Sequence, residues 1–315
     1  MRLLRRIYLS QLVRGSFFVF LAGNFAGLGN FFYNLAMGRM LSPANYGELE
    51  AVLSLSVLFA VPLSVLSIFV VKIVSSYWGQ KKQADVRSFL AFYRQKLFII
   101  GLAGSVLLLL FSPVLVRFLN LSSVLSVVFL SLFFLLGGLS TVNNGGLQGT
   151  LSFGLLAING IVGTAVKLFV SVVLVLVNFQ LSGALFGPFL GSLTGFLLSV
   201  LELKRIFKDV ASTKNGISPA VLKSTFFPTL FASLALTVFM TLDVILARHF
   251  FSRSVSGEYA AISVLGKIIY YAVGPVISVM FPLISSRAGN GTSYLLPLFG
   301  SLAMVTGVGS LISFV

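Results

Sequence analysis

Two lysines lie deep inside apolar stretches of this 315-residue chain. Lys167 is in the apolar run 153–177 and Lys267 is in the run 259–283, at depths on the order of 15 Å for a helix that rises 1.5 Å per residue. A lysine there costs at least about 2.5 kcal/mol on insertion scales, so it is expected to face the protein interior or a water-filled cavity. The alternative is that each long side chain snorkels toward an interface.

One acidic residue, Asp243, lies well inside the apolar run 225–247. Its carboxylate can pair either with Lys267 or with Arg248 at the rim of the same run. Such a pair either holds two helices together or takes part in ion coupling. The neighbouring His249, the only histidine of the chain, is expected at the membrane interface.

Three glutamates belong to a repeated segment. Residues 38–53 form a polar elbow between two apolar runs, and residues 248–265 repeat it more weakly at an offset of 210 residues. A helical hairpin repeated in parallel predicts two related lobes, and chance similarity between two Gly-Glu turns is the alternative. Glu48, Glu50 and Glu258 are expected at the outer ends of the helices that follow each elbow, where the positive dipole end favours them.

The composition assigns the chain to a class. Hydrophobic residues make up 57% and charged residues 9%, with a mean hydropathy of +1.05, whereas soluble domains average about 25% charged residues. The chain is therefore expected to be an integral membrane protein. Because it has no cysteine and one histidine, neither a thiolate metal site nor paired imidazoles are available, and no cofactor is predicted. The net charge of +15 is explained by membrane topology without nucleic acid.

The apolar runs predict an all-α polytopic membrane protein with two pseudo-symmetric lobes, built as a parallel repeat of six helices each. Residues 1–203 would form the N-terminal lobe, 204–223 a cytoplasmic linker, and 224–315 a partial C-terminal lobe of about three helices. The 210-residue offset places the end of that third helix beyond Val315, so the second lobe is expected to be truncated there. The predicted spans are 16–37, 51–71, 97–116, 124–139, 153–177, 182–201, 225–247, 259–283 and 293–315. A loop is expected at 75–94, and short connectors are expected around Asn120, at 143–148 and at 178–180.

The positively charged residues orient these spans. With the N-terminus inside, sixteen Lys and Arg residues fall on the cytoplasmic side and four on the other. Cytoplasmic loops carry such an excess. The sequence therefore predicts a multi-pass protein of the cell membrane with a cytoplasmic N-terminus and with both elbows outside.

Several motifs in this order resemble bacterial and archaeal polysaccharide flippases, the polysaccharide transporter branch of the multidrug, oligosaccharidyl-lipid and polysaccharide exporter superfamily. The resemblance covers essentially the whole chain. It rests on Leu-Ser-Pro-Ala-Asn-Tyr-Gly at 41–47, Leu-Gln-Gly-Thr-Leu-Ser-Phe at 147–153, Gly-Ala-Leu at 183–185, Asp-Val-Ile-Leu-Ala-Arg-His-Phe at 243–250 and Gly-Glu-Tyr-Ala-Ala at 257–261.

The resemblance implies two six-helix lobes around a central cavity, without enzymatic activity. Such a protein moves a lipid-linked oligosaccharide, carried on polyprenyl diphosphate, from the cytoplasmic to the outer leaflet by alternating access. Its partners would be the bilayer, this substrate and possible glycan assembly enzymes. Lys167 stands where members commonly carry an arginine, which keeps the charge but loses the bidentate fork. Lys167 and Lys267 would contact the diphosphate, and Arg14 would help capture it at the cytoplasmic mouth.

Three other classes of protein are alternatives. A cation or drug antiporter of the same superfamily would share the fold, but acids would be expected in its cavity where this chain has deep lysines. A membrane glycosyltransferase or polysaccharide polymerase would need acids or large external loops. Glu48 and Glu50 offer a Glu-x-Glu pair, but every predicted external loop is short and no donor site is visible in the sequence. A pump with its own ATPase would show a phosphate-binding loop, Gly-x-x-x-x-Gly-Lys-Ser/Thr, and the sequence contains none.

Overall fold

The computed structural model describes residues 25–211 and 223–267, and every regular element in these ranges is helical. Five of the described helical segments are long and apolar enough to cross a membrane, so the expected all-α polytopic membrane fold is confirmed. The elements are residues 25–40, α2 (Pro43–Gly79), α3 (Gln83–Leu110), α4 (Ser112–Phe118), α5 (Leu125–Gly149), α6 (Phe153–Leu174), the π-helix η1 (Val175–Phe179), α7 (Gln180–Ile206), α8 (Lys223–Phe250) and residues 253–267.

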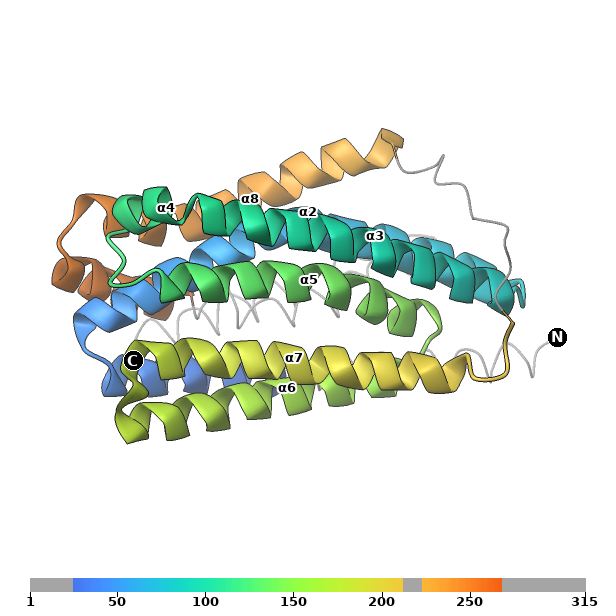
Figure 1. Ribbon diagram of the computed structural model, residues 1–315, viewed down its shortest axis with the longest axis horizontal. Helices are drawn as coiled ribbons and strands as arrows, with labels where there is room; N and C mark the ends of the chain where they lie inside the picture. Colours follow the sequence, from blue (N-terminus) through green and yellow to red (C-terminus); the bar gives the residue numbers. More distant parts are fainter. Residues whose placement is uncertain (1–24, 212–222, 268–315) are drawn as a thin grey trace, which may run out of the picture.

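The long helices run roughly along the longest axis of the molecule (Figure 1). We call one end of the bundle the elbow end and the other the linker end. The elbow end carries the turns at 41–42, 119–124 and 251–252, and the linker end carries those at 80–82, 150–152 and 207–211. The helices α6 and α7 form one side of the bundle, and α8 lies on the opposite side, where it packs against α2.

The helix α2 begins sharply at the first elbow because its sequence carries start signals. Ser42 is extended, and its side chain accepts a hydrogen bond from the backbone nitrogen of Asn45 at 3.4 Å. Pro43 occupies the first turn, where its missing N–H costs no hydrogen bond.

The expected loop at 75–94 is wrong, because most of it is helical. The helix α2 has 37 residues, well beyond the roughly 20 that cross a bilayer, and only residues 80–82 separate it from α3. The extra turns pack at the linker end, where the rings of Trp78 and Phe207 lie 5.9 Å apart. Polar residues on a packed helix do not interrupt it.

The predicted connector at 143–148 is also helical, since α5 continues to Gly149. Asn143 is buried and donates to the Ser199 hydroxyl at 3.0 Å, so its polarity is satisfied between helices. Gly145 lies against Val70 with no room for a Cβ atom. These contacts make the segment part of the bundle.

The turn predicted near Asn178 is present. Asn178 has φ of 67° and Gln180 has φ of 42°, a left-handed conformation that reverses the chain between α6 and α7. The glycines of α7 then allow close packing, since a Cβ atom on Gly187 would lie 2.5 Å from the carbonyl oxygen of Lys167. Glycine every four residues, at 183, 187, 191 and 195, gives α7 a face of small residues that permits this approach.

Buried apolar side chains form two clusters, one at each end of the bundle. The elbow-end cluster joins both repeats, because Leu49 of α2 packs there with Val244 of α8. The linker-end cluster includes Val74, Phe89 and Phe207 from α2, α3 and the end of α7.

Some predictions fall outside the described residues. They concern Arg14, the remainder of the eighth span and the whole span 293–315. The lobe boundaries therefore stay predictions.

Candidate functional site

Lys167 lies about 20 Å along α6 from its first residue, at 1.5 Å per residue. Its amino group donates to the Asn30 side-chain oxygen at 2.9 Å and lies 3.9 Å from the centroid of the Tyr33 ring. Tyr33 is fully buried, and its hydroxyl donates to the carbonyl oxygen of Ala184 at 2.9 Å. The ammonium is therefore held by a neutral amide and an aromatic face.

The glycines of α7 explain why the Lys167 side chain turns this way. Gly187 and Gly191 lie directly against the Lys167 backbone, and a Cβ atom on Gly191 would be 3.0 Å from the Lys167 Cβ atom. The helix α7 therefore closes one side of Lys167 and directs the side chain toward residues 25–40.

Glu50 of α2 is the acidic member of this cluster. Its side chain is 7% exposed, and its carboxylate interacts electrostatically with both Lys167 and Lys267. Tyr46 is a hydrogen-bonding neighbour of the carboxylate, but Oε1 has no hydrogen-bond partner among the described residues. A buried, unsatisfied carboxylate oxygen is unusual in a folded protein and points to a ligand or water.

The predicted position of Glu50 and Glu48 at a helix end is wrong. The first turn of α2 contains no acidic residue, and both side chains are buried inside the bundle. The sequence reading missed Asn30, Tyr33 and Glu50 as neighbours of Lys167. Glu50 lies just before the predicted run 51–71, so no charge within an apolar run marked it.

Lys267 contacts Asp243 at 3.0 Å between Nζ and Oδ1, and Ser263 donates to the other carboxylate oxygen at 2.5 Å. Of the two partners considered for Asp243, the structure selects Lys267. The side chains of Lys267 and Asp243 are 17% and 28% exposed, so the pair is partly reached by solvent.

Arg248 pairs instead with Glu48, at 3.3 Å between Nη2 and Oε2, and both side chains are 1% exposed. The guanidinium also donates to backbone oxygens of both repeats and to the Ser256 hydroxyl. These acceptors are the carbonyl oxygens of Ala44, Leu119, Asn120 and Arg253. One side chain thus joins α8 to α2 and to the connector before α5.

The Glu48 carboxylate is equally well satisfied. It accepts from the Ser126 hydroxyl and from the Ser122 backbone nitrogen, both at 2.7 Å. We call this group, Glu48, Ser122, Ser126 and Arg248, the elbow clasp. Its full set of hydrogen bonds is what a buried ion pair needs to be tolerated.

The two repeated elbows meet beside the elbow clasp. Gly47 and Gly257, which correspond under the 210-residue offset, are in direct contact, and a Cβ atom on Gly47 would lie 2.7 Å from the Gly257 Cα atom. Only residues without side chains permit this backbone approach. The equivalent glutamates differ, because Glu48 is buried and Glu258 is exposed.

His249 lies beside this contact and is partly buried; its position at the membrane interface stays a prediction. Its ring stacks on Phe118 with centroids 4.4 Å apart, and Nδ1 is 2.6 Å from the Phe118 carbonyl oxygen.

We call Asn30, Glu50, Lys167, Asp243 and Lys267 the central cluster. It brings together side chains from both repeats, through the Asn30–Lys167 and Asp243–Lys267 contacts and the carboxylate of Glu50. The Lys167 ammonium has three N–H donors and forms no ion pair in the described ranges, so it can still donate to an anion. The Glu50 carboxylate can compete with that anion for both lysines.

The sequence matches the protein family described as polysaccharide biosynthesis protein over residues 36–309. No protein of curated function matches it significantly by sequence.

Three solved structures share the fold. The inward-facing conformation of a multidrug resistance MATE family transporter of the MOP superfamily has a TM-score of 0.67 and 13% identity, covering 90% of this chain and 68% of that one. A MOP superfamily transporter from Pyrococcus furiosus, described by the reverse polarity of its binding pocket, has a TM-score of 0.56 and 15% identity. The match covers 96% of this chain and 70% of that one. The multidrug transporter DinF-BH in complex with R6G has a TM-score of 0.62 and 13% identity. The match covers 97% of this chain and 71% of that one.

Proposed function

We propose that this chain, which belongs to the polysaccharide biosynthesis protein family, flips a lipid-linked oligosaccharide across the cell membrane. The substrate is carried on polyprenyl diphosphate and moves from the cytoplasmic to the outer leaflet by alternating access. The protein forms and breaks no covalent bond. The diphosphate head needs only a water-filled, cationic path, and the polyprenyl tail stays in lipid.

The observation that carries the proposal is the state of Lys167. Its ammonium lies deep in α6 on neutral partners, Asn30 and Tyr33, and retains donors for a phosphate oxygen. An amine with this much unused hydrogen-bonding capacity is costly at such depth. Binding of an anionic head group would offset that cost.

Lys267 brings the second lobe to the same substrate. Lys167 belongs to the proposed N-terminal lobe, residues 1–203, and Lys267 to the proposed C-terminal lobe, residues 224–315. A diphosphate that contacts both lysines would be held between the lobes. It would therefore move when one lobe rocks against the other. Arg14 would extend the path at the cytoplasmic mouth.

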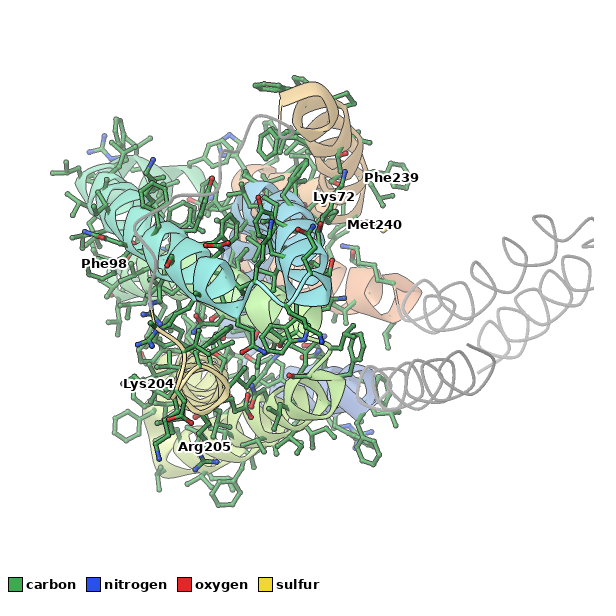
Figure 2. The ribbon with its side chains drawn as sticks, turned by 90° about the vertical axis from the view of Figure 1, so that its right-hand side faces the viewer. Lys72, Phe98, Lys204, Arg205, Phe239 and Met240 are labelled. Atoms are coloured by element: carbon green, nitrogen blue, oxygen red, sulfur yellow. The ribbon has the colours of Figure 1, made fainter. Side chains whose placement is uncertain are left out.

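The proposed orientation makes the elbow end external and the linker end cytoplasmic. Lys204 and Arg205 are exposed where α7 reaches the linker end (Figure 2), in line with the excess of positive charge on cytoplasmic segments. The elbow clasp then closes the outer side, so this conformation is the one that receives substrate from the cytoplasm.

Transport of a defined polyprenyl diphosphate oligosaccharide in liposomes tests the proposal. We expect Lys167→Ala and Lys267→Ala each to lower the flipping rate at least about tenfold, since a charge-assisted contact contributes about 1.5–3 kcal/mol. The matched control is Lys204→Ala, which removes an exposed lysine at the linker end. Full transport by both cluster variants, with normal amounts of protein in the membrane, would refute the role of the central cluster.

Export of a cation or drug is the second candidate, and Glu50 and Asp243 favour it because they place two carboxylates in the same cluster. One similar structure was solved with R6G. Rhodamine 6G and inorganic pyrophosphate, titrated separately into the purified protein, distinguish the two candidates. The flippase proposal expects pyrophosphate binding that depends on Lys167, and rhodamine binding that depends on Glu50 would instead support the antiporter.

A further inference from the structure

A groove of about 540 Å³ opens on the side of the bundle formed by α3, α5 and α7. It is lined by Ala91, Arg94, Gln95 and Phe98 of α3, Leu139 of α5 and Phe196 of α7. The helix α5 packs against both neighbours, whereas α3 and α7 are not packed extensively on each other, so α5 forms the floor. Figure 2 shows the helices that carry Phe98 and Lys204 on this side.

The groove lies away from the central cluster and the second repeat. The helix α8 packs on α2 and makes no extensive contact with α3 or α7. A ligand here would therefore meet the protein from the surrounding bilayer and not from the space between the lobes. It would be independent of the substrate proposed above.

The lining combines polar and apolar side chains. Arg94 and Gln95 come just before the apolar run of α3, which begins at Leu97, within about 5 Å at 1.5 Å per residue. Ala91, Phe98, Leu139 and Phe196 supply the apolar part of the lining. A charged head beside an apolar channel matches a single phospholipid, with its phosphate at the interface and one acyl chain along the helices.

The charge of Arg94 favours an anionic lipid. No acidic side chain within residues 25–211 and 223–267 pairs with Arg94. Nearby basic residues of α3 have other partners, since Lys96 lies 4.5 Å from the centroid of the Phe92 ring and Arg87 donates to the carbonyl oxygen of Phe207 at 3.3 Å. A guanidinium can bind a phosphate through two parallel hydrogen bonds, and basic pockets between membrane helices on the cytoplasmic side bind anionic head groups.

We propose that this groove is a binding site for an anionic phospholipid, with Arg94 on the phosphate and an acyl chain against Phe98, Leu139 and Phe196. The occupant is a bilayer lipid, in contrast to the polyprenyl substrate. A lipid bound at this site would set the depth of the N-terminal lobe in the cytoplasmic leaflet.

Titration of the purified full chain with palmitoyl-oleoyl phosphatidylglycerol, followed by native mass spectrometry, tests this site. The neutral comparison lipid is palmitoyl-oleoyl phosphatidylcholine. We expect the wild type to hold one phosphatidylglycerol molecule in preference to phosphatidylcholine, and Arg94→Gln to weaken phosphatidylglycerol binding about tenfold, the effect of losing one charge-assisted contact. Lys96→Gln is the matched control, because it removes a charge two residues away that does not line the groove.

A second variant tests the apolar part. Ala91→Phe would fill the groove and is expected to weaken binding of both lipids while the melting temperature stays near that of the wild type. The proposal is refuted if Arg94→Gln binds phosphatidylglycerol as the wild type does, or if Lys96→Gln loses it equally. It is also refuted if polyprenyl phosphate displaces phosphatidylglycerol from this groove, since the occupant would then be the substrate tail.

Discussion

The elbow clasp and the central cluster contain the same kinds of residue but differ in how their charges are satisfied. In the clasp, the Glu48 carboxylate and the Arg248 guanidinium are both 1% exposed, and hydrogen bonds surround them. In the central cluster, Lys167 rests on neutral groups and Glu50 keeps an unpartnered oxygen. The clasp lies where the two elbows meet, and the central cluster joins residues 25–40, α2 and α6 to α8 and residues 253–267.

The difference indicates which charges stabilise the fold and which are available to bind a ligand. A buried pair with every hydrogen bond made is stable only as a unit, because removal of one partner leaves the other uncompensated. Replacing an incompletely satisfied group costs the fold little stability, and a ligand that binds such a group supplies the missing interactions. Stability should therefore depend mainly on the clasp, and binding mainly on the central cluster.

Arg248→Met should have the largest effect. It leaves the Glu48 carboxylate buried without its countercharge, at a cost of about 3–5 kcal/mol in the free energy of unfolding. Thermal unfolding in detergent measures the loss. The double variant Glu48→Leu with Arg248→Met should recover much of it, because no lone charge remains. A single variant as stable as the wild type would show that the clasp does not hold the repeats together.

Gly257→Ala should come next. A Cβ atom there would clash with the Pro43 carbonyl group, so the elbows must separate, at a cost of about 1–3 kcal/mol. Gly266→Ala lies on the same helix in open space and should be neutral or slightly stabilising, since alanine has the higher helix propensity. Equal melting temperatures for the two variants would contradict close contact between the elbows.

Glu50→Gln should change binding more than stability. It removes the carboxylate that competes for Lys167 and Lys267 but keeps the side-chain volume, so pyrophosphate affinity should rise about tenfold, equivalent to ~1.4 kcal/mol. Isothermal titration calorimetry measures it. The control is Glu202→Gln, a buried glutamate of α7 that accepts from the Asn159 amide at 2.8 Å and should leave the affinity unchanged. Unchanged affinity in Glu50→Gln would place Glu50 outside the anion site.

Glu258→Gln should have the smallest effect, although Glu258 corresponds to Glu48 in the repeat. Its side chain is exposed, and exposed substitutions away from special features rarely change stability. Its melting temperature should match that of the wild type, whereas Glu48→Gln should melt lower. Similar losses in both variants would mean that the clasp has a symmetric counterpart.

Much of the fold was predictable from sequence because the relevant signals are local. Hydropathy identified the membrane class, and Asn178 marked the turn between α6 and α7. The loops at 75–94 and 143–148 were mispredicted because the helices continue through these polar stretches. At 143–148 the helix buries Asn143, whose amide donates to Ser199. Polarity alone does not say whether such a partner exists.

The site was predictable only in part. The depth of Lys167 and Lys267 marked them from sequence, because a charge within an apolar run is unfavourable wherever the helix packs. Their neighbours Asn30 and Glu50 were not marked in this way, because each is far from Lys167 in the chain and becomes its neighbour only when the helices assemble.

The sequence by itself determined that this chain is a helical membrane protein with a repeated elbow, since apolar run length and residue spacing act along the chain. Only the tertiary structure decided that Arg248 pairs with Glu48, that Asp243 pairs with Lys267, and that equivalent glutamates are buried in one repeat and exposed in the other. The Arg248–Glu48 pair joins residues 200 positions apart, and the Asp243–Lys267 pair joins residues 24 positions apart on consecutive helices. The same short motif therefore became part of a clasp at Glu48 and a solvated surface at Glu258.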